Sequence, residues 1–390
     1  MESGSLLFSF FLIFSGAAVL ATGALFTRQP LIVAYIVLGA FFGPYGMELV
    51  TDTGLLNDIS HVGIIFLLFL LGLDMQPAHL GNLLRKTATV GILSSLLFAT
   101  VGYGAGVLFG FSQTEALICG ATMMFSSTII GIKLLPTTVL HHKHTGELLV
   151  SLLLLQDLIA ILVLLLLYNF EPSHSRNYND LIIALVALPL LILAAILMVR
   201  FVLLPLMAKF DRFHEYLFLL AIGWCLGFAE LAHSMNLSYE IGAFIAGISI
   251  ATSPISQYIA INLKPLRDFF LVLFFFSIGA SFNLDLLSQV LLPALLLSAA
   301  VVVLKPLIFG VLLQRVSEKK SAAWEVGFRL GQTSEFSILI AVLASSQLLI
   351  GEIASHVIQA TAILTLIVSS YVVVFRFESP IAVSEKLRRD

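Results

Sequence analysis

Charged residues are scarce in this chain of 390 residues. Lysine, arginine, aspartate and glutamate together make up 11% of the sequence, whereas about 25% is usual for a soluble domain. A water-soluble protein needs a polar, charged surface around its core. This composition therefore excludes a soluble globular domain as the main body of the chain.

Cysteines and basic clusters are scarce as well. The two cysteines, Cys119 and Cys225, both fall inside apolar stretches, which excludes a disulfide framework. The net charge is −3 and no basic cluster suits nucleic acid. No metal-binding cluster, catalytic triad or phosphate-binding loop is visible. We therefore expect no enzyme activity, no cofactor and no nucleic-acid partner.

Long apolar runs are what the sequence has in abundance. Hydrophobic residues make up 59% of the chain, and the mean hydropathy is +1.05. Apolar runs of about 20 residues recur, enough for a helix to cross a hydrocarbon layer about 30 Å thick. The first run lacks a basic leading segment, so we interpret it as a span rather than a signal peptide. We predict an all-α polytopic membrane protein with thirteen transmembrane helices, at residues 6–26, 31–47, 61–75, 88–110, 114–135, 146–170, 181–206, 215–233, 239–252, 266–281, 286–313, 322–347 and 354–375.

The distribution of basic residues predicts the orientation of these helices. If the N-terminus is outside, the outer loops carry a single basic residue, Arg176. The inner loops and the segment after Phe375 then carry 16 of the 20 lysines and arginines. The positive-inside rule places the N-terminus outside and the C-terminus in the cytoplasm. We expect an integral protein of a bacterial inner or plasma membrane.

Two pairs of segments predict an internal repeat. The pattern G-x-T-x-x-F-S begins at Gly120 and again at Gly331, 211 residues later. The segments AYIVLGAFFGP, from Ala34, and AFIAGISIATSP, from Ala243, are also alike at an offset near 209. Chance similarity between apolar helices is the alternative explanation, but two matches at nearly one offset favour a repeat.

The repeat gives the chain a simple predicted organisation. Six spans, one connecting span and six further spans place the second half in the opposite orientation, as in many secondary transporters. We predict one transmembrane domain over residues 1–390, without a soluble regulatory domain. Its parts are repeat one at 6–170, the connecting helix at 181–206, repeat two at 215–375, and a short cytoplasmic tail at 376–390.

Two of the spans are expected to be broken. Polar residues lie at mid-depth in the fifth and twelfth spans, and such groups can satisfy the backbone that unwinding frees. The ends of half-helices can also stabilise an ion. The alternative is ordinary packing of hydroxyl groups between intact helices. The polar residues are Ser126, Ser127 and Thr128 in the fifth span, and Gln332, Thr333 and Ser334 in the twelfth.

Asp157 lies near the middle of the sixth span, about 15 Å from either surface. A carboxylate at that depth costs several kcal/mol unless it is protonated, paired or bound to a cation. One carboxylate can hold a proton or a metal ion, each expelling the other. Gln156 would add an amide oxygen as a cation ligand. A purely structural ion pair is the alternative.

Lys305 is the expected partner of Asp157, with Glu335 as another possible partner. Lys305 lies ten residues before Arg315, too deep to reach the cytoplasmic surface easily. A pair broken by cation entry would couple binding to conformational change. We therefore predict a coupling or structural ion pair that involves Lys305 and Glu335.

Three histidines, His141, His142 and His144, lie in the predicted cytoplasmic loop before the sixth span. Histidine titrates near neutral pH, so one interpretation is a pH sensor. The other interpretation is an ordinary polar loop.

Several motifs in order resemble one known family. The chain resembles the cation:proton antiporter-2 family, and most closely the membrane domain of Kef-type potassium/proton antiporters, over nearly all of its length. The matching segments are AYIVLGAFFGP (from Ala34), FLLFLLGLDMQP (from Phe66), FSSTIIG (from Phe125), LLQD (from Leu154), LFFFSIGASF (from Leu273) and GQTSEF (from Gly331).

The resemblance implies a homodimer, with a dimerisation domain and a mobile core that carries the two crossed, broken helices. It implies that Asp157 carries the ion and the proton, with Gln156 at the position where Kef-type members have glutamine. It places Lys305 as the basic residue on the preceding helix. One departure is that Thr333 and Ser334 replace the family's usual glycine pair.

The sequence thus predicts a secondary active transporter that exchanges a monovalent cation for protons through Asp157. Potassium is favoured and sodium is an alternative, and no other metal is expected. Its other partner would be membrane lipid. Two further hypotheses are a channel-like cation efflux pathway, although no TVGYG-like filter is present, and a sodium-coupled transporter of organic anions.

Overall fold

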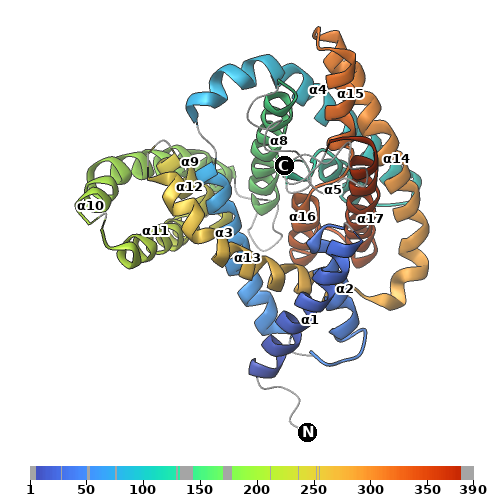
Figure 1. Ribbon diagram of the computed structural model, residues 1–390, viewed down its shortest axis with the longest axis horizontal. Helices are drawn as coiled ribbons and strands as arrows, with labels where there is room; N and C mark the ends of the chain where they lie inside the picture. The colour runs from blue at the N-terminus through green and yellow to red at the C-terminus, as the bar shows by residue number, and fades with distance from the viewer. Residues whose placement is uncertain are drawn as a thin grey trace. The chain divides into compact units, whose positions relative to one another are not determined.

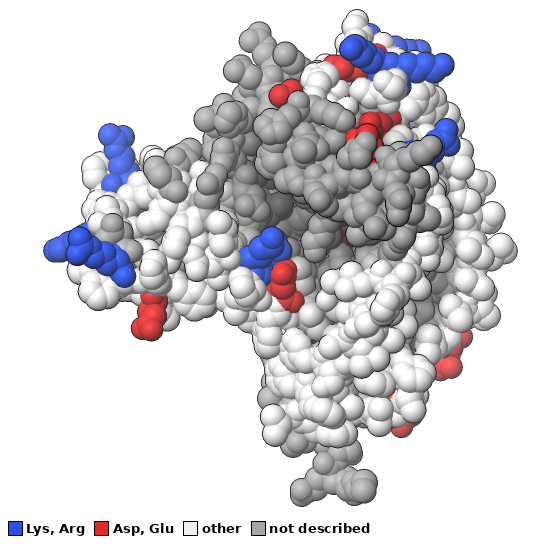
Figure 2. Space-filling model, in the orientation of Figure 1, with Lys and Arg blue, Asp and Glu red and all other residues white. Residues whose placement is uncertain are grey.

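The computed structural model describes residues 6–27, 29–50, 53–74, 77–128, 131, 144–169, 178–210, 212–235, 237–251, 253 and 255–378. Throughout these ranges the regular secondary structure is helical. Seven of the described helices are long and apolar enough to cross a bilayer. Figure 2 shows a face on which uncharged side chains predominate, as a lipid-facing surface requires. The prediction of an all-α integral membrane protein is confirmed, and the count of thirteen spans stays a prediction.

The chain forms two compact units. The first comprises residues 1–9, 50–81 and 165–277. Its closest internal packing is between α3 and α12, where a Cβ on Gly247 would collide with the carbonyl oxygen of Phe69. Its helices are α3 (Thr53–Asp74), α9 (Tyr178–Met198), the π-helical turn η1 (Val199–Leu203), α10 (Leu204–Lys209), α11 (His214–Ser234), α12 (Tyr239–Ala251) and most of α13 (Ser256–Ala280).

The second unit comprises residues 10–49, 82–164 and 278–390, and it contains every described residue of the predicted site. In this unit α5, α16 and α17 contact one another, and α14 packs on α15 and α17 (Figure 1). Its helices are most of α1 (Leu6–Phe26), α2 (Leu31–Phe42), most of α4 (Pro77–Leu108), α5 (Gln113–Met123), most of α8 (His144–Asn169), the 3-10 turn η2 (Leu284–Leu286), α14 (Leu287–Arg315), α15 (Lys320–Arg329), α16 (Glu335–Ser346) and α17 (Glu352–Arg376).

The start of α5 is fixed by local capping. The hydroxyl of Ser112 accepts a hydrogen bond from the backbone N–H of Glu115, whose carboxylate accepts one in return from the N–H of Ser112. This capping box satisfies two backbone donors that the first helical turn leaves free. Glu115 also accepts a hydrogen bond from the N–H of Gly351, just before α17. The capping box therefore sets the start of α5 and ties it to the loop before α17.

The series of backbone hydrogen bonds that forms the helices is interrupted at two places. The first unwound segment is residues 124–127, after the end of α5, and the second is residues 330–334, between α15 and α16. Ser334 starts α16 as its N-cap, with its hydroxyl accepting from the N–H of Phe336 at 3.1 Å. The twelfth predicted span is thus broken where its polar residues lie. Most of the predicted fifth span beyond Thr128 lies outside the described residues.

Candidate functional site

The two unwound segments contact each other directly. The hydroxyl of Ser126 donates to the carbonyl oxygen of Leu330 at 2.9 Å, across 204 residues of sequence. In the other direction, Ser337 on α16 donates to the carbonyl oxygen of Thr122 on α5. All four residues are buried. The polar groups of one segment therefore satisfy backbone groups freed at the other, as a non-helical backbone inside a membrane protein requires.

Lys305 on α14 joins the two segments. Its ammonium donates to the carbonyl oxygen of Phe125 at 2.6 Å and to that of Gln332 at 2.9 Å. A third, longer hydrogen bond reaches the hydroxyl of Ser126 at 3.3 Å. These three bonds use the full donor capacity of an ammonium group. Lys305 thus bridges the two unwound segments through their backbones.

This position differs from the ion pair that the sequence led us to expect. Lys305 pairs with neither Asp157 nor Glu335 in any ion pair formed between described residues. Unwinding exposes carbonyl oxygens whose partial negative charge can hold a buried ammonium, and sequence patterns do not reveal them. The expected Asp157–Lys305 contact is therefore replaced by contacts to carbonyl oxygens.

Asp157 lies on α8 with a side chain that is 1% exposed. The hydroxyl of Thr128 is 3.4 Å and 3.5 Å from its two carboxylate oxygens. Glu335, at the start of α16, is also buried and interacts with Asp157 electrostatically. A buried carboxylate that feels the field of a second one favours the retention of a proton or a cation.

Gln156 contacts the backbone of the first unwound segment. Its side-chain oxygen accepts a hydrogen bond from the backbone N–H of Ser126 at 2.9 Å. Its side-chain nitrogen is buried and has no hydrogen-bond partner among the described residues. This bond leaves the oxygen a second lone pair, so its role as a cation ligand stays a prediction. Gln156 also shapes the site through the backbone of Ser126.

Two residues of α17 hold the second unwound segment, and the sequence analysis missed both. Thr365 accepts a hydrogen bond from the N–H of Thr333 at 3.1 Å, and the two threonine hydroxyls are 2.9 Å apart. Ser369 donates to the side-chain oxygen of Gln332 at 2.7 Å. The available signal was a pair of hydroxyl residues four apart, hence on one helix face, in an apolar span.

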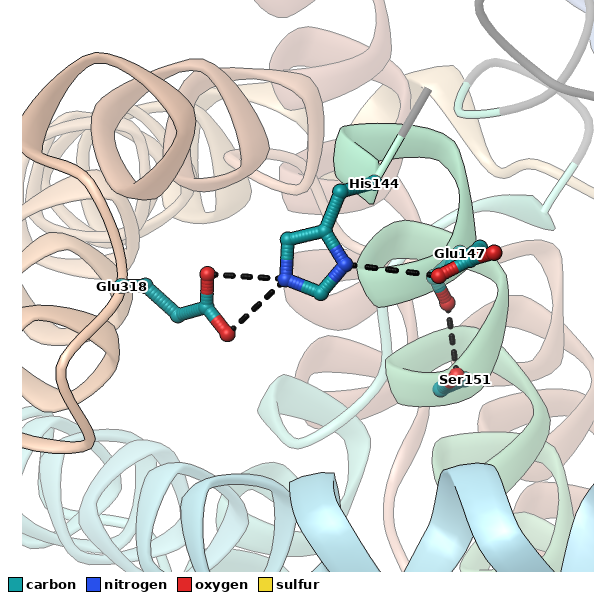
Figure 3. A network of polar contacts seen from close by, with 4 residues as sticks. All are labelled: His144, Glu147, Ser151 and Glu318. Atoms are coloured by element: carbon teal, nitrogen blue, oxygen red, sulfur yellow. Dashed lines mark hydrogen bonds and ion pairs between the residues drawn. The ribbon is translucent and has the colours of Figure 1, made fainter. Parts of the chain in front are cut away.

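A second polar cluster lies at the start of α8 (Figure 3). One ring nitrogen of His144 is 2.9 Å from Glu318, in the turn between α14 and α15, and the other is 3.3 Å from Glu147. Both nitrogens therefore face carboxylates, which favours the protonated ring that donates from both. Ser151 donates to the carbonyl oxygen of Glu147. His141 and His142 lie outside the described residues.

The second unit thus combines two contacting unwound segments, a lysine that bridges them and a buried carboxylate beside them. Among the described residues, no group of three or more His, Cys, Asp and Glu side chains could hold a metal ion. The transmembrane sodium/hydrogen exchanger family model matches residues 10–378. The chain belongs to the sodium/hydrogen exchanger family. The resemblance to cation:proton antiporters is thereby confirmed.

Curated relatives of this exchanger-family chain include transporters of different cations. K(+) efflux antiporters 6 and 4 of Arabidopsis thaliana are 28% and 30% identical over 328 and 330 residues. Both alignments cover 82% of this chain but 54% and 55% of the relatives, so the chain spans about half their length. The iron transporter MagA of Paramagnetospirillum magneticum is 27% identical over 361 residues, covering 91% of this chain and 82% of the relative.

A solved structure shares the fold. The sodium proton antiporter MjNhaP1 of Methanocaldococcus jannaschii, solved at pH 8, matches with a TM-score of 0.69 and 18% sequence identity. The match covers 92% of this chain and 94% of that one. The architecture of this exchanger-family chain is therefore that of a known antiporter.

Proposed function

We propose that the chain is a secondary active transporter that exchanges a monovalent cation for protons, with Asp157 carrying each in turn. The observation behind the proposal is a buried carboxylate beside two unwound segments, with a second carboxylate, Glu335, as its charged neighbour. Binding of a proton or of one cation relieves the same unfavourable charge, so the two compete for one place. Thr128 is the hydroxyl nearest to that place.

Potassium is the favoured cation, and sodium is the alternative. The residue before Asp157 is a neutral amide, and the hydroxyl of Thr128, also neutral, lies 3.4 Å from a carboxylate oxygen of Asp157. Neutral oxygens compensate the dehydration of a large ion more readily than that of a small one. The K(+) efflux antiporters among the relatives support the same preference.

The membrane arrangement is part of the proposal. Thirteen spans form a 6+1+6 inverted repeat with the N-terminus outside and the C-terminus in the cytoplasm, and two copies form a homodimer in the lipid bilayer. The positions of the breaks support the repeat, since α5 and α15 end 206 residues apart, at Met123 and Arg329. In two oppositely oriented repeats, both breaks fall at the same depth.

Proton flux in everted vesicles tests this function. A pH-sensitive dye reports the release of protons when potassium, sodium or choline chloride is added to vesicles acidified inside. We expect release with potassium at least as strong as with sodium, and none with choline. Competition between potassium and sodium in one vesicle preparation measures the preference, and strong sodium selectivity would remove the potassium assignment.

The same vesicles separate the other hypotheses. A channel-like pathway would pass the cation down its electrical gradient without moving protons. A sodium-coupled transporter would accumulate an organic anion and show no cation-driven proton release. Either result would overturn the exchange proposal.

A further inference from the structure

Thr365 and Ser369 on α17 lie where the second unwound segment needs polar partners. Thr365 is fully buried and Ser369 is 2% exposed. They lie four residues apart, on one face of a helix that is otherwise rich in apolar residues. Both contact the unwound segment, at Thr333 and at Gln332.

The hydroxyl of Thr365 is fully used. It donates to the carbonyl oxygen of Ala362 in its own helix at 3.0 Å and accepts from the backbone N–H of Thr333 at 3.1 Å. A hydroxyl has one hydrogen to donate, so the side chain of Thr333 is the donor in the remaining 2.9 Å contact. Thr365 thus accepts both donors of Thr333.

Ser369 fixes the neighbouring residue. Its hydroxyl donates to the side-chain oxygen of Gln332, while the side-chain nitrogen of Gln332 donates to the carbonyl oxygen of Arg329 at 2.9 Å. These contacts set the orientation of the Gln332 amide, because a carbonyl can only accept. The backbone oxygen of the same residue accepts from Lys305. Holding Gln332 therefore also holds the acceptor of Lys305.

The same arrangement occurs at the first unwound segment with different residues. There α8 supplies Gln156, which accepts the backbone N–H of Ser126. Ser126 and Thr333 lie 207 residues apart, and so do Phe125 and Gln332, the two residues whose carbonyl oxygens bind Lys305. Thr365 therefore occupies the place at the second segment that Gln156 occupies at the first.

We propose that Thr365 and Ser369 are positioning residues for cation/proton exchange. They hold Gln332 and Thr333 so that Lys305 keeps both carbonyl partners and the backbone beside Asp157 keeps its shape. This inference rests on the proposed function, because its main measurement is the half-maximal cation concentration of exchange.

The first test compares Thr365→Val with Thr361→Val in the full chain. Valine keeps the shape of threonine without its hydroxyl. Thr361 is equally buried on the same helix, but its hydroxyl donates to Val357 of its own helix at 2.7 Å and does not reach the unwound segment. We expect Thr365→Val to raise the KM for the cation about tenfold, since it leaves two buried donors of Thr333 without an acceptor. Thr361→Val should keep the KM of the wild type.

Thr365→Ser should restore the wild-type KM, because serine keeps the hydroxyl. A merely structural role would reduce the amount of folded protein and its unfolding temperature without changing the KM of the molecules that remain folded. The KM and the unfolding temperature are therefore measured on the same purified and reconstituted samples.

The second comparison is Ser369→Ala with Ser370→Ala. Ser370 is also buried, but its hydroxyl donates to Ile367 of its own helix at 2.8 Å, and its oxygen lies 3.4 Å from the side-chain oxygen of Gln29. We expect Ser369→Ala to raise the KM about threefold, less than Thr365→Val does, because the backbone N–H of Thr333 keeps its acceptor. If Thr365→Val fails to fold, this pair carries the test.

The outcomes separate the two proposals. If the wild type shows no cation-driven proton release, the proposed function fails. If the wild type exchanges normally while Thr365→Val and Ser369→Ala keep its KM, the positioning role fails and the function stands. A rise in KM as large in Thr361→Val or Ser370→Ala would also overturn the positioning role.

Discussion

The two unwound segments share one bridging residue and differ in the helix that supports each of them. Each gives a carbonyl oxygen to Lys305. At the first segment, α8 places Gln156 next to Asp157; at the second, α17 places Thr365 next to Leu366. The two supporting residues bind the backbone in a similar way, but the next residue is a carboxylate on α8 and an aliphatic side chain on α17.

This difference teaches that the support of the backbone and the chemistry of exchange are separable. Both segments need donors and acceptors because both lack a helical ladder. Of the two residues that follow the supporting ones, Asp157 on α8 can bind a proton or a cation and Leu366 on α17 cannot. Substitutions at corresponding residues of α8 and α17 should therefore have different kinds of effect.

The largest effect is expected at Asp157, the residue in which α8 differs chemically from α17. Asp157→Asn should reduce cation-driven proton release to the vesicle background while the protein stays folded, because an amide can neither titrate nor neutralise a cation. Leu366→Met is the matched control on α17 and should keep exchange, since the side-chain volume is nearly unchanged. Dye-reported proton release measures both. Full exchange by Asp157→Asn would remove this residue from the mechanism.

The next largest effect is expected at Lys305, which binds carbonyl oxygens of both unwound segments. Lys305→Met removes the donor of two buried carbonyl oxygens, and each such loss costs about 1–3 kcal/mol. We expect a lower unfolding temperature in detergent. Lys305→Gln, which keeps an amide donor, should fall between this variant and the wild type and retain substantial exchange. Equal unfolding temperatures for Lys305→Met and the wild type would show that the bridge does not stabilise the segments.

A smaller effect, on cation preference, should distinguish Gln156 from Thr365, which support the first and the second unwound segment. Gln156→Glu keeps an oxygen for the N–H of Ser126 but adds a second charge beside Asp157. We expect a shift of preference toward sodium, because a stronger anionic field compensates the dehydration of a small ion better. Competition between potassium and sodium measures it. Thr365→Ser is the matched control and should leave the preference unchanged; an unaltered preference in Gln156→Glu would contradict the proposed selectivity.

The smallest effect is expected away from both segments, at His144. Its contacts with Glu147 and Glu318 are ion pairs only while the ring is protonated, so their contribution is present at low pH and lost as the pH rises. The side chains of His144 and Glu147 are 55% and 61% exposed, so His144→Gln should lower stability by no more than about 1 kcal/mol near pH 6. Thermal unfolding near pH 6 and pH 9 measures the difference. A gap that widened toward pH 9 would contradict this assignment.

The register of the proposed repeat shows how far a sequence pattern can go. The G-x-T-x-x-F-S motif aligns Thr122 with Thr333 at an offset of 211, and its two copies fall in the regions that contain the two unwound segments. The hydrogen bonds instead relate Ser126 to Thr333, at an offset of 207. The discrepancy of four residues is about one helical turn, and apolar helices repeat their character at that interval. Similarity therefore found the regions but not the corresponding residues.

The sequence by itself determined the membrane class, the helical fold, the break in the twelfth predicted span and the burial of Asp157. These follow from local composition, because apolar runs and mid-span polar residues have direct consequences in a bilayer. The tertiary structure alone decided that Lys305 binds carbonyl oxygens, that Gln156 serves Ser126, and that α17 holds the second segment. Such contacts join residues far apart in the chain, 180 residues in the case of Lys305 and Phe125. No local pattern encodes which carbonyl a distant ammonium will reach, because that depends on how the helices pack.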